Sequence, residues 1–223
     1  MLVTTYFRVI DLLMERLLKA KRHSDPALAQ ARRNQVLTAA AECFHRKGFH
    51  AAGMAEISRT AGMSPGHIYN YFESKEAIIE SIIEKDMEEM FSIFDQFEGQ
   101  PEDTLTVLLN GLNVGVQRHM ENGACSVNLE MLAEAGRNNK VAKLLRDADT
   151  LARNRMRQLL TSEKSAIRDI NEIELDSRIN VIFSVMAGLL LRKVLYPELT
   201  EETVLIALRP AIKTLLMPFE NNE

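Results

Sequence analysis

Tryptophan is absent from this 223-residue sequence, and proline and glycine are scarce, at six and ten residues. A chain with so few helix-breaking residues, and with much Ala, Leu, Glu and Arg, favours helix along its whole length. No run of alternating β-branched residues predicts a strand. We therefore expect an all-α fold, and the 46% of hydrophobic residues are enough for a sizeable core in one large domain or two unequal ones.

Cysteine is nearly absent as well. Cys43 and Cys125 lie far apart in the sequence, which argues against a disulfide framework and makes a reducing cytoplasm the natural setting. The five histidines never stand beside Cys or carboxylates at ligand spacing, so no metal site is expected. No nucleophile and base form a recognisable motif and no phosphate-binding loop is present, so we expect neither an enzyme nor a cofactor.

Long hydrophobic runs are missing too. The longest uncharged runs, Thr104 to Gln117 and Ile179 to Leu191, are shorter than a bilayer requires, so they predict buried core helices and no membrane partner.

Charge is unevenly distributed along the chain. Residues 1–73 carry 10 Lys and Arg against 6 Asp and Glu, a balance of +4, whereas the remainder carries 17 against 25, a balance of −8. A basic N-terminal third on an acidic protein suits a DNA-binding domain attached to a body that does not touch nucleic acid.

The stretch from Met54 to Phe72 predicts two short helices joined by a sharp turn. Met54, Ile57 and Ala61 share one face of the first helix, and Gly62 supplies a backbone that turns without a Cβ clash. Helices this short need to pack against a neighbouring helix to be stable. Helix-turn-helix units of this kind often present their second helix to DNA.

The second helix restarts at once, because Ser64 is placed to cap it and Pro65 suits its first position. Ile68 and Phe72 would then face inward. We expect the outward residues to contact bases, phosphates or the groove floor; the alternative is an ordinary polar surface on a helical hairpin. The candidate DNA-binding residues here are Ser64, Pro65, Gly66, His67, Tyr69, Asn70 and Tyr71.

Matched positions at fixed spacing extend on both sides of this stretch. They are Gly48-Phe49, Ile57, Ala61-Gly62-Met63-Ser64, Gly66, Ile68-Tyr69, Tyr71-Phe72 and Ser74-Lys75-Glu76. This pattern, over about residues 26–95, resembles the signature of the TetR/AcrR family of bacterial transcriptional regulators. The resemblance implies a three-helix DNA-binding head with a helix-turn-helix, on a larger helical body that dimerises and binds a small effector.

The resemblance also bears on Arg32, Arg33 and Gly53, and the helix dipole bears on Lys75. Family members often contact the phosphate backbone near Arg32 and Arg33, for which a solvated helix surface is the alternative. Lys75 stands in the first turn of the next long helix, where a cation is unfavourable unless a phosphate is near. At Gly53 the family usually has Thr or Ser, and glycine offers no side-chain oxygen to the helix or to a phosphate.

The domain boundaries that we predict are an N-terminal extension at 1–24, the DNA-binding head at 25–73 and the body at 74–223. The extension has the apolar spacing of a helix, and it is an extra docked helix, a basic arm or partly a start-site artefact, since Met14 could also initiate. Beyond the long helix at 74–97 we expect helices at 102–121, 126–135, 139–162, 171–195 and 201–217.

The resemblance assigns two tasks to the body. Its last two long helices are expected to form a homodimer interface, which would present two heads to a roughly palindromic operator in double-stranded DNA. The interface residues expected there are Ile179, Ile182, Phe183, Met186, Leu190, Leu205, Leu208 and Ile212.

The second task is binding a small, largely hydrophobic effector inside the body. Glu130 and Glu134 would favour a cationic ligand if they faced inward, although we favour surface exposure for both. The candidate effector residues are Leu112, Val116, Met120, Leu129, Glu130, Met131, Glu134, Leu145 and Phe183.

Together these features predict a ligand-responsive DNA-binding regulator, with repression favoured because most relatives repress. The alternatives are a transcriptional activator and a helical small-molecule-binding protein that does not touch DNA.

Overall fold

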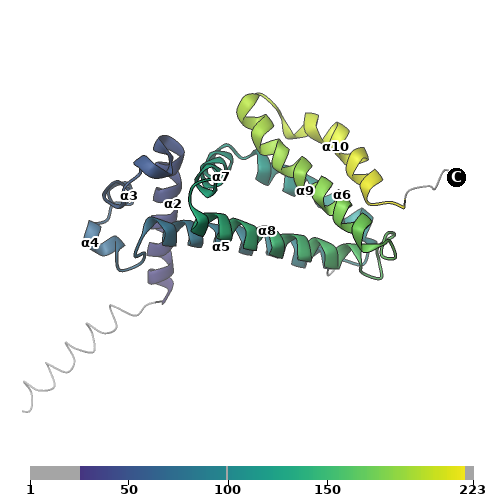
Figure 1. Cartoon of the computed structure of the whole chain (residues 1–223), viewed down its shortest axis with the longest axis horizontal. Helices are drawn as coiled ribbons and strands as arrows, with labels where there is room; N and C mark the ends of the chain where they lie inside the picture. Colours follow the sequence, from purple (N-terminus) through teal and green to yellow (C-terminus); the bar gives the residue numbers. More distant parts are fainter. Residues whose placement is uncertain (1–25, 99, 219–223) are drawn as a thin grey trace, which may run out of the picture.

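A computed structural model describes residues 26–98 and 100–218, and this part of the chain is helical without a strand, as predicted (Figure 1). The predicted extension at 1–24 lies outside the described residues. The helices are α2 (Pro26–Ala51), α3 (Met54–Thr60), α4 (Pro65–Ile68), α5 (Lys75–Glu98), α6 (Thr104–Met120), α7 (Asn122–Ala135), α8 (Asn139–Leu160), α9 (Glu172–Leu195) and α10 (Glu201–Leu215).

The predicted body helices are confirmed, and side-chain caps explain where they begin. Asp103 accepts from the Thr106 N–H, Asn138 from the Lys140 and Val141 N–H groups, Asn171 from the Glu174 N–H and Thr200 from the Thr203 N–H. Each cap satisfies a backbone donor that the first turn leaves unpaired, which stabilises a helix by about 1 kcal/mol. Only α7 departs clearly, because it begins at residue 122 rather than at 126.

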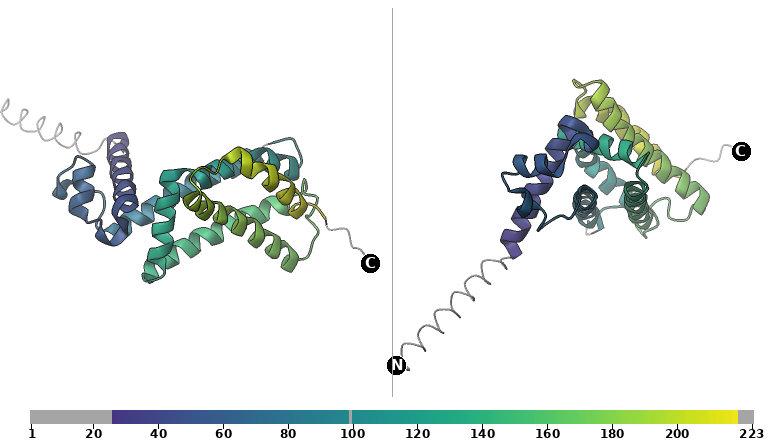
Figure 2. Two further views of the ribbon diagram at one scale, coloured as in Figure 1. Left: turned by 90° about the horizontal axis from the view of Figure 1, so that it is seen from above. Right: turned by 60° about the vertical axis from the view of Figure 1, so that its left-hand side comes forward.

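The molecule is elongated, with the head at one end and the C-terminal helices at the other (Figures 1 and 2). Helices α2, α3 and α4 form the head. Helix α5 leaves the head and runs alongside α8, while α7 packs against α2, and α6 packs against α9 and α10.

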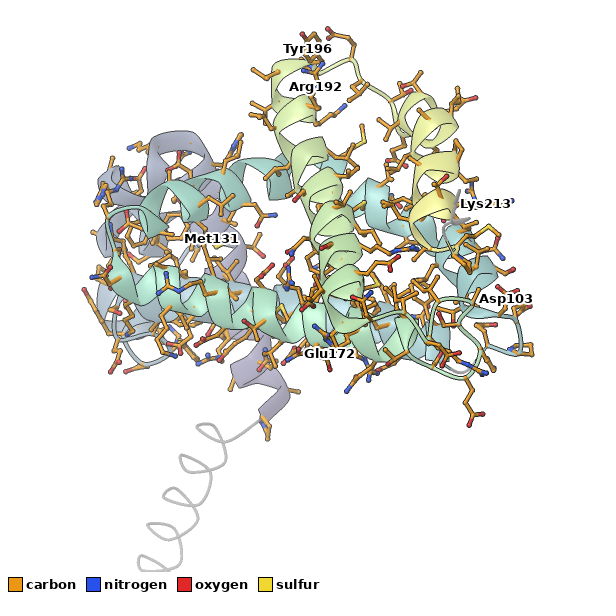
Figure 3. All side chains as sticks on the ribbon, turned by 45° about the vertical axis from the view of Figure 1, so that its right-hand side comes forward. Asp103, Met131, Glu172, Arg192, Tyr196 and Lys213 are labelled. Carbon is orange, nitrogen blue, oxygen red and sulfur yellow. The ribbon has the colours of Figure 1, made fainter. Side chains whose placement is uncertain are left out.

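Two hydrophobic cores follow from this arrangement. The first joins head and body, because buried Val127, Met131 and Val141 of α7 and α8 pack against Phe49 and its neighbours in the head. Figure 3 shows Met131 where α7 passes over the head. The second core lies in the body, among α5, α6, α8, α9 and α10. Head and body are therefore in contact through apolar packing as well as through the continuous helix α5.

Two glycines adopt backbone conformations that other residues rarely take. Gly48 interrupts α2 with φ of 76°, and Gly62 makes the turn after α3 with φ of 63°. Both fall in the left-handed region, where a side chain would be strained. The turn predicted at Gly62 is thus confirmed, and Gly48 forms a kink within α2.

None of the helices in the described part of the chain is long and apolar enough to cross a bilayer.

The burial of α9 generates a stability prediction with an internal control. Ile179 is fully buried and Ile173, on the same helix, is 82% exposed. Ile179→Ala should lower the free energy of unfolding by about 2–5 kcal/mol, because it removes buried methyl groups and leaves a cavity. Ile173→Ala should change it by less than about 0.5 kcal/mol. Urea unfolding followed by circular dichroism, at one protein concentration, compares the two; equal losses would mean that α9 is not oriented as described.

Candidate nucleic-acid interface and ligand cavity

The candidate recognition segment is a single helical turn with a side-chain cap. The Ser64 hydroxyl accepts a hydrogen bond from the His67 N–H at 3.3 Å, and Pro65 occupies the first helical position. Ile68 is fully buried and Phe72 is 2% exposed, so both face the head core as predicted. Because α4 spans only four residues, the chain continues through a turn in which the Tyr71 and Phe72 N–H groups donate to the Ile68 carbonyl at 3.0 Å.

The side of this segment that faces away from the core is polar and open to solvent. Tyr69 is 54% exposed, and the Tyr71 hydroxyl lies 3.3 Å from Nε2 of His67, which orients both side chains. The structure thus brings the candidate DNA-binding residues of α4 and its turn to one surface. Of these, Ser64, Pro65, Gly66, His67, Tyr69 and Asn70 are exposed and Tyr71 is half-buried.

Arg33 has internal partners, which the sequence did not indicate. Its Nη1 donates to the Tyr71 carbonyl at 3.0 Å and its Nη2 donates to the Ser81 hydroxyl at 3.1 Å. The guanidinium also lies 4.5 Å from the centre of the Phe72 ring. Arg33 therefore ties α2 to the recognition turn and to α5 and positions both, while phosphate contact by Arg33 stays a prediction.

The Arg32 side chain lies at the exposed surface of α2, as the predicted phosphate contact requires. Its Nη1 donates to the Gln35 side chain at 2.8 Å, one turn along the exposed surface of α2. A hydrogen bond to the neutral Gln35 side chain contributes little, so a phosphate could replace Gln35 as the partner of Arg32. Phosphate contact by Arg32 stays a prediction.

Lys75 also has internal partners. Its ammonium donates to the Phe49 carbonyl at 2.7 Å and to the His50 carbonyl at 3.4 Å, and it lies 4.3 Å from the centre of the Phe49 ring. These contacts offset the unfavourable position of a cation in the first turn of α5. No phosphate is needed to explain Lys75, and its contacts fasten α5 to the end of α2.

Two carboxylates on α7 hold the same end of α2. Oε2 of Glu130 accepts from the Phe49 N–H at 3.3 Å, and Oε2 of Glu134 lies 3.1 Å from Nε2 of His50. Glu134 is 2% exposed, so the expectation of surface exposure is wrong for this residue. Burial alone would raise the pKa of Glu134, but donation by Arg137 and Asn138, with the charges of His50 and Arg137, holds it below its usual value.

The body contains a cavity of about 290 Å³ between α5, α6, α8, α9 and α10. Two of the candidate effector residues, Leu112 and Phe183, line it together with Phe94, Phe97 and Met186. Val116 and Met120 are buried in the body core but do not line the cavity. Four other candidates lie around the head–body contact, because α7 packs on α2: Glu130, Met131, Glu134 and Leu145. Leu129, also on α7, does not line the cavity either.

Two glycines of α6 lie beside the cavity, and their spacing in the sequence could have indicated its position. Gly111 and Gly115 stand one turn apart and both line the cavity. A Cβ at position 111 would lie 2.2 Å from Cζ of Phe97, and one at position 115 would lie 3.2 Å from the Met186 methyl carbon. Two glycines one turn apart inside a helix mark such a close approach.

The residues expected at the dimer interface face the wrong way for that role. Ile179, Ile182, Leu190, Leu208 and Ile212 are at most 6% exposed, because they form the chain's own core. They are unavailable to a second chain, and the prediction is wrong for them. Phe183, Met186 and Leu205 are half-buried against the same core.

The opposite face of α9 and α10 is apolar and exposed. Leu191 is 51% exposed and Ile206 is 72% exposed. Residues at helical spacing extend this face along α9 to the end where Arg192 stacks 4.1 Å from the Tyr196 ring centre (Figure 3). We name the exposed apolar residues of α9 from Val181 onward, with Ile206 of α10, the α9–α10 face: Val181, Val185, Leu191, Val194, Leu195 and Ile206.

Among the described residues, no cluster of three or more His, Cys, Asp or Glu side chains is arranged to hold a metal ion.

Comparison with known proteins points to one family. Residues 36–82 match the family model described as "Bacterial regulatory proteins, tetR family". The HTH-type transcriptional regulator UidR of Escherichia coli is 36% identical over 121 residues, which cover 53% of this chain and 59% of UidR. The match thus spans little more than half the length of that relative.

Solved structures share the fold over most of the chain. The fatty acid degradation regulator FadR from Bacillus halodurans has a TM-score of 0.70 at 21% identity, covering 86% of this chain and 97% of its own. FadR from Bacillus subtilis, in complex with stearoyl-CoA, has a TM-score of 0.67 at 19% identity, covering 82% and 96%. At these identities the likeness concerns the fold.

The two neighbouring arginines of α2 provide a prediction with a matched control. Arg33→Ala should lower the free energy of unfolding by about 1–3 kcal/mol, because it removes two charge-assisted hydrogen bonds and leaves the Tyr71 carbonyl without its donor. Arg32→Ala should change it by less than about 0.5 kcal/mol. Denaturant unfolding at fixed protein concentration measures both, and equal effects would contradict the internal tie.

Proposed function

We propose that this chain is a ligand-responsive transcriptional regulator of the TetR family and that it binds a roughly palindromic operator as a homodimer. A small, largely hydrophobic effector in the body cavity releases it. The observation that carries this proposal is the exposed polar surface of α4, held on a head that matches the family model at residues 36–82.

The chemistry of the α4 surface supports DNA binding. His67 and Asn70 offer donors and acceptors for base edges, and Tyr69 offers a hydroxyl for a phosphate. A single α4 reads only a few base pairs, so a useful affinity needs two heads. A two-fold dimer presents them to major grooves one helical turn apart, roughly 34 Å. This spacing requires an operator of matching symmetry.

The α9–α10 face supports dimerisation. Contiguous exposed apolar surface is uncommon on a monomer and marks an interaction site. When this face packs against the same face of a second chain, both chains bury the same apolar residues, and this stabilises a two-fold dimer. We therefore propose Leu191 and Ile206 as interface residues in place of the buried ones.

The two helices that reach the head support coupling between cavity and operator. Helix α5 contacts the head through Lys75 and lines the cavity through Phe94 and Phe97. Helix α7 holds the head through Glu130 and follows directly on α6, which also lines the cavity. An effector that prefers one arrangement of α5 and α6 therefore shifts the population of head positions.

Repression is the simpler outcome of such binding. A dimer seated on promoter DNA blocks access by occupancy alone, whereas activation requires a further contact with the transcription machinery. The chromosome is the target, so we place the protein in the cytoplasm. We propose no catalytic activity, and a helical carrier that ignores DNA is the competing hypothesis.

DNA binding is tested with the full chain and the duplex upstream of its own gene. His67→Ala and Asn70→Ala should each alter base preference, with costs of about 1–3 kcal/mol at the contacted positions. Arg32→Ala should weaken binding to all sequences and reduce the slope of log K against log[salt] by about 1. Fluorescence anisotropy over a salt series measures both effects.

Glu198→Ala, beyond the end of α9, is the control and should leave the affinity unchanged. If the unaltered chain binds no duplex even at low salt, the regulator hypothesis fails and the carrier hypothesis takes its place.

Dimerisation is tested by placing a charge on the α9–α10 face. Leu191→Glu should convert the dimer to a monomer, because a buried unpaired carboxylate is costly at an interface. Leu132→Glu is the matched control, since Leu132 on α7 is similarly exposed, at 56%. Sedimentation velocity reports the masses; a dimer that survives Leu191→Glu would place the interface elsewhere.

A further inference from the structure

The body cavity is lined by apolar groups on almost every side. Apart from Arg118, His119 and Asp149, each residue that lines it is apolar or glycine. Protein interiors seldom keep a void of about 290 Å³, because the side chains around a void lose contacts with partner atoms. A hydrophobic ligand that fills the cavity restores those contacts.

The volume of the cavity bounds the size of such a ligand. An apolar protein cavity of roughly 150 Å³ stays dry and accommodates benzene. The cavity here, at about 290 Å³, is roughly twice as large. A ligand with two fused rings therefore fills it, whereas a single ring leaves part of the lining without contact and three fused rings exceed the space.

The lining also favours a flat aromatic shape. Phe94 and Phe97 of α5 meet edge to face, with ring centres 6.3 Å apart and an interplanar angle of 89°, and Phe183 of α9 lines the same cavity. Three methionines join them: Met90, Met156 and Met186. Aromatic ligands pack well against rings and against thioether sulfur. A flexible alkyl chain, in contrast, loses conformational freedom when a compact cavity holds it.

Phe97 lies where the cavity ends. Phe97 and Leu108 line the body cavity and also a second, more polar hollow, whose lining includes Gln158 and Lys164. The Phe97 ring packs directly on α6, because a Cβ at Gly111 would lie 2.2 Å from its Cζ. The ring thus separates the two spaces and limits the length of a ligand in the apolar one.

We propose that the body cavity selects a flat aromatic ligand of about two fused rings, and that the Phe97 side chain sets the upper size limit. The proposal rests on the proposed function, since it takes this cavity as the effector site. It narrows the effector from hydrophobic molecules in general to one size and one shape.

Four uncharged probes separate size from shape: phenol, 2-naphthol, 9-phenanthrol and 1-decanol. Isothermal titration calorimetry of the full chain at pH 7 should rank 2-naphthol first. Phenol should bind at least about tenfold more weakly, because it covers less apolar surface. The three-ring 9-phenanthrol should also lose at least about tenfold, because it overfills the cavity.

The fourth probe, 1-decanol, tests shape at constant size, since it has as many heavy atoms as 2-naphthol. It should bind at least about tenfold more weakly than 2-naphthol, because its chain must be ordered in the cavity. Hydrophobicity alone would favour 9-phenanthrol and 1-decanol. Equal binding of the four probes, tighter binding of either of these two, or no binding of 2-naphthol would overturn the proposal.

A variant of Phe97 tests the size limit. Phe97→Ala should strengthen 9-phenanthrol binding about tenfold or more, because loss of the ring joins the two spaces and removes the overfilling. Phe91→Ala is the matched control, since Phe91 lies on the same helix and packs against the body core without lining the cavity. Unchanged 9-phenanthrol binding in Phe97→Ala, or an equal gain in Phe91→Ala, would contradict the size limit.

Gly115→Leu tests the location of the ligand and does not depend on the Phe97 variant. A Cβ at position 115 would lie 3.2 Å from the Met186 methyl carbon, so the added side chain enters the cavity. The variant should weaken 2-naphthol binding at least about tenfold, because it occupies the space of the ligand. Undiminished binding would place the probe elsewhere and overturn the assignment to this cavity.

Operator affinity, measured by anisotropy on each variant without probe, shows that the variant is folded and separates the two hypotheses. A chain that binds its operator but prefers 1-decanol or 9-phenanthrol retains the proposed function and loses the ligand assignment. A chain that ranks the probes as expected but binds no duplex retains the ligand assignment and loses the proposed function.

Discussion

A recognition segment of one helical turn cannot hold its own shape, because nucleating a helix fixes several residues for very few hydrogen bonds. Helix α4 has four residues, so its conformation depends on what stands behind it. Ile68 and Phe72 anchor it in the head core, Ser64 caps its start, and Arg33 holds the carbonyl that follows it. The shape of the surface around α4 is thus determined by inward side chains and by one arginine from another helix. This explains why a polar face without strong helix formers keeps a defined geometry.

Contacts from distant helices also hold the head against the body. The end of α2 near Phe49 and His50 receives the Lys75 ammonium from α5 and the Glu130 and Glu134 carboxylates from α7. Both of these helices connect to cavity walls, α5 directly and α7 through α6. Apolar packing and polar contacts therefore both hold the head against the body at this point.

The helical pattern of the sequence predicted the fold and most helix ends, because caps and apolar spacing are local signals. The inward pair Ile68 and Phe72 was predictable for the same reason. Partners between distant elements were not: nothing near Arg33 or Lys75 in the sequence indicates a carbonyl 38 or 26 residues away. The choice of five dimer-interface residues was wrong for a related reason. Both faces of α9 are apolar, and only the packing of α6 against one of them shows which face stays open. Likewise, the position of Glu134 depended on where α7 lies, which its own sequence does not specify.

The central claim is that the surface around α4 lies in the major groove and that two copies do so together. Hydroxyl-radical footprinting of the full chain on its operator tests this most directly. We expect two protected clusters on one face of the duplex, separated by about one helical turn of DNA or a whole multiple of it. Protection of one cluster only, or even protection along the duplex without periodicity, would contradict it.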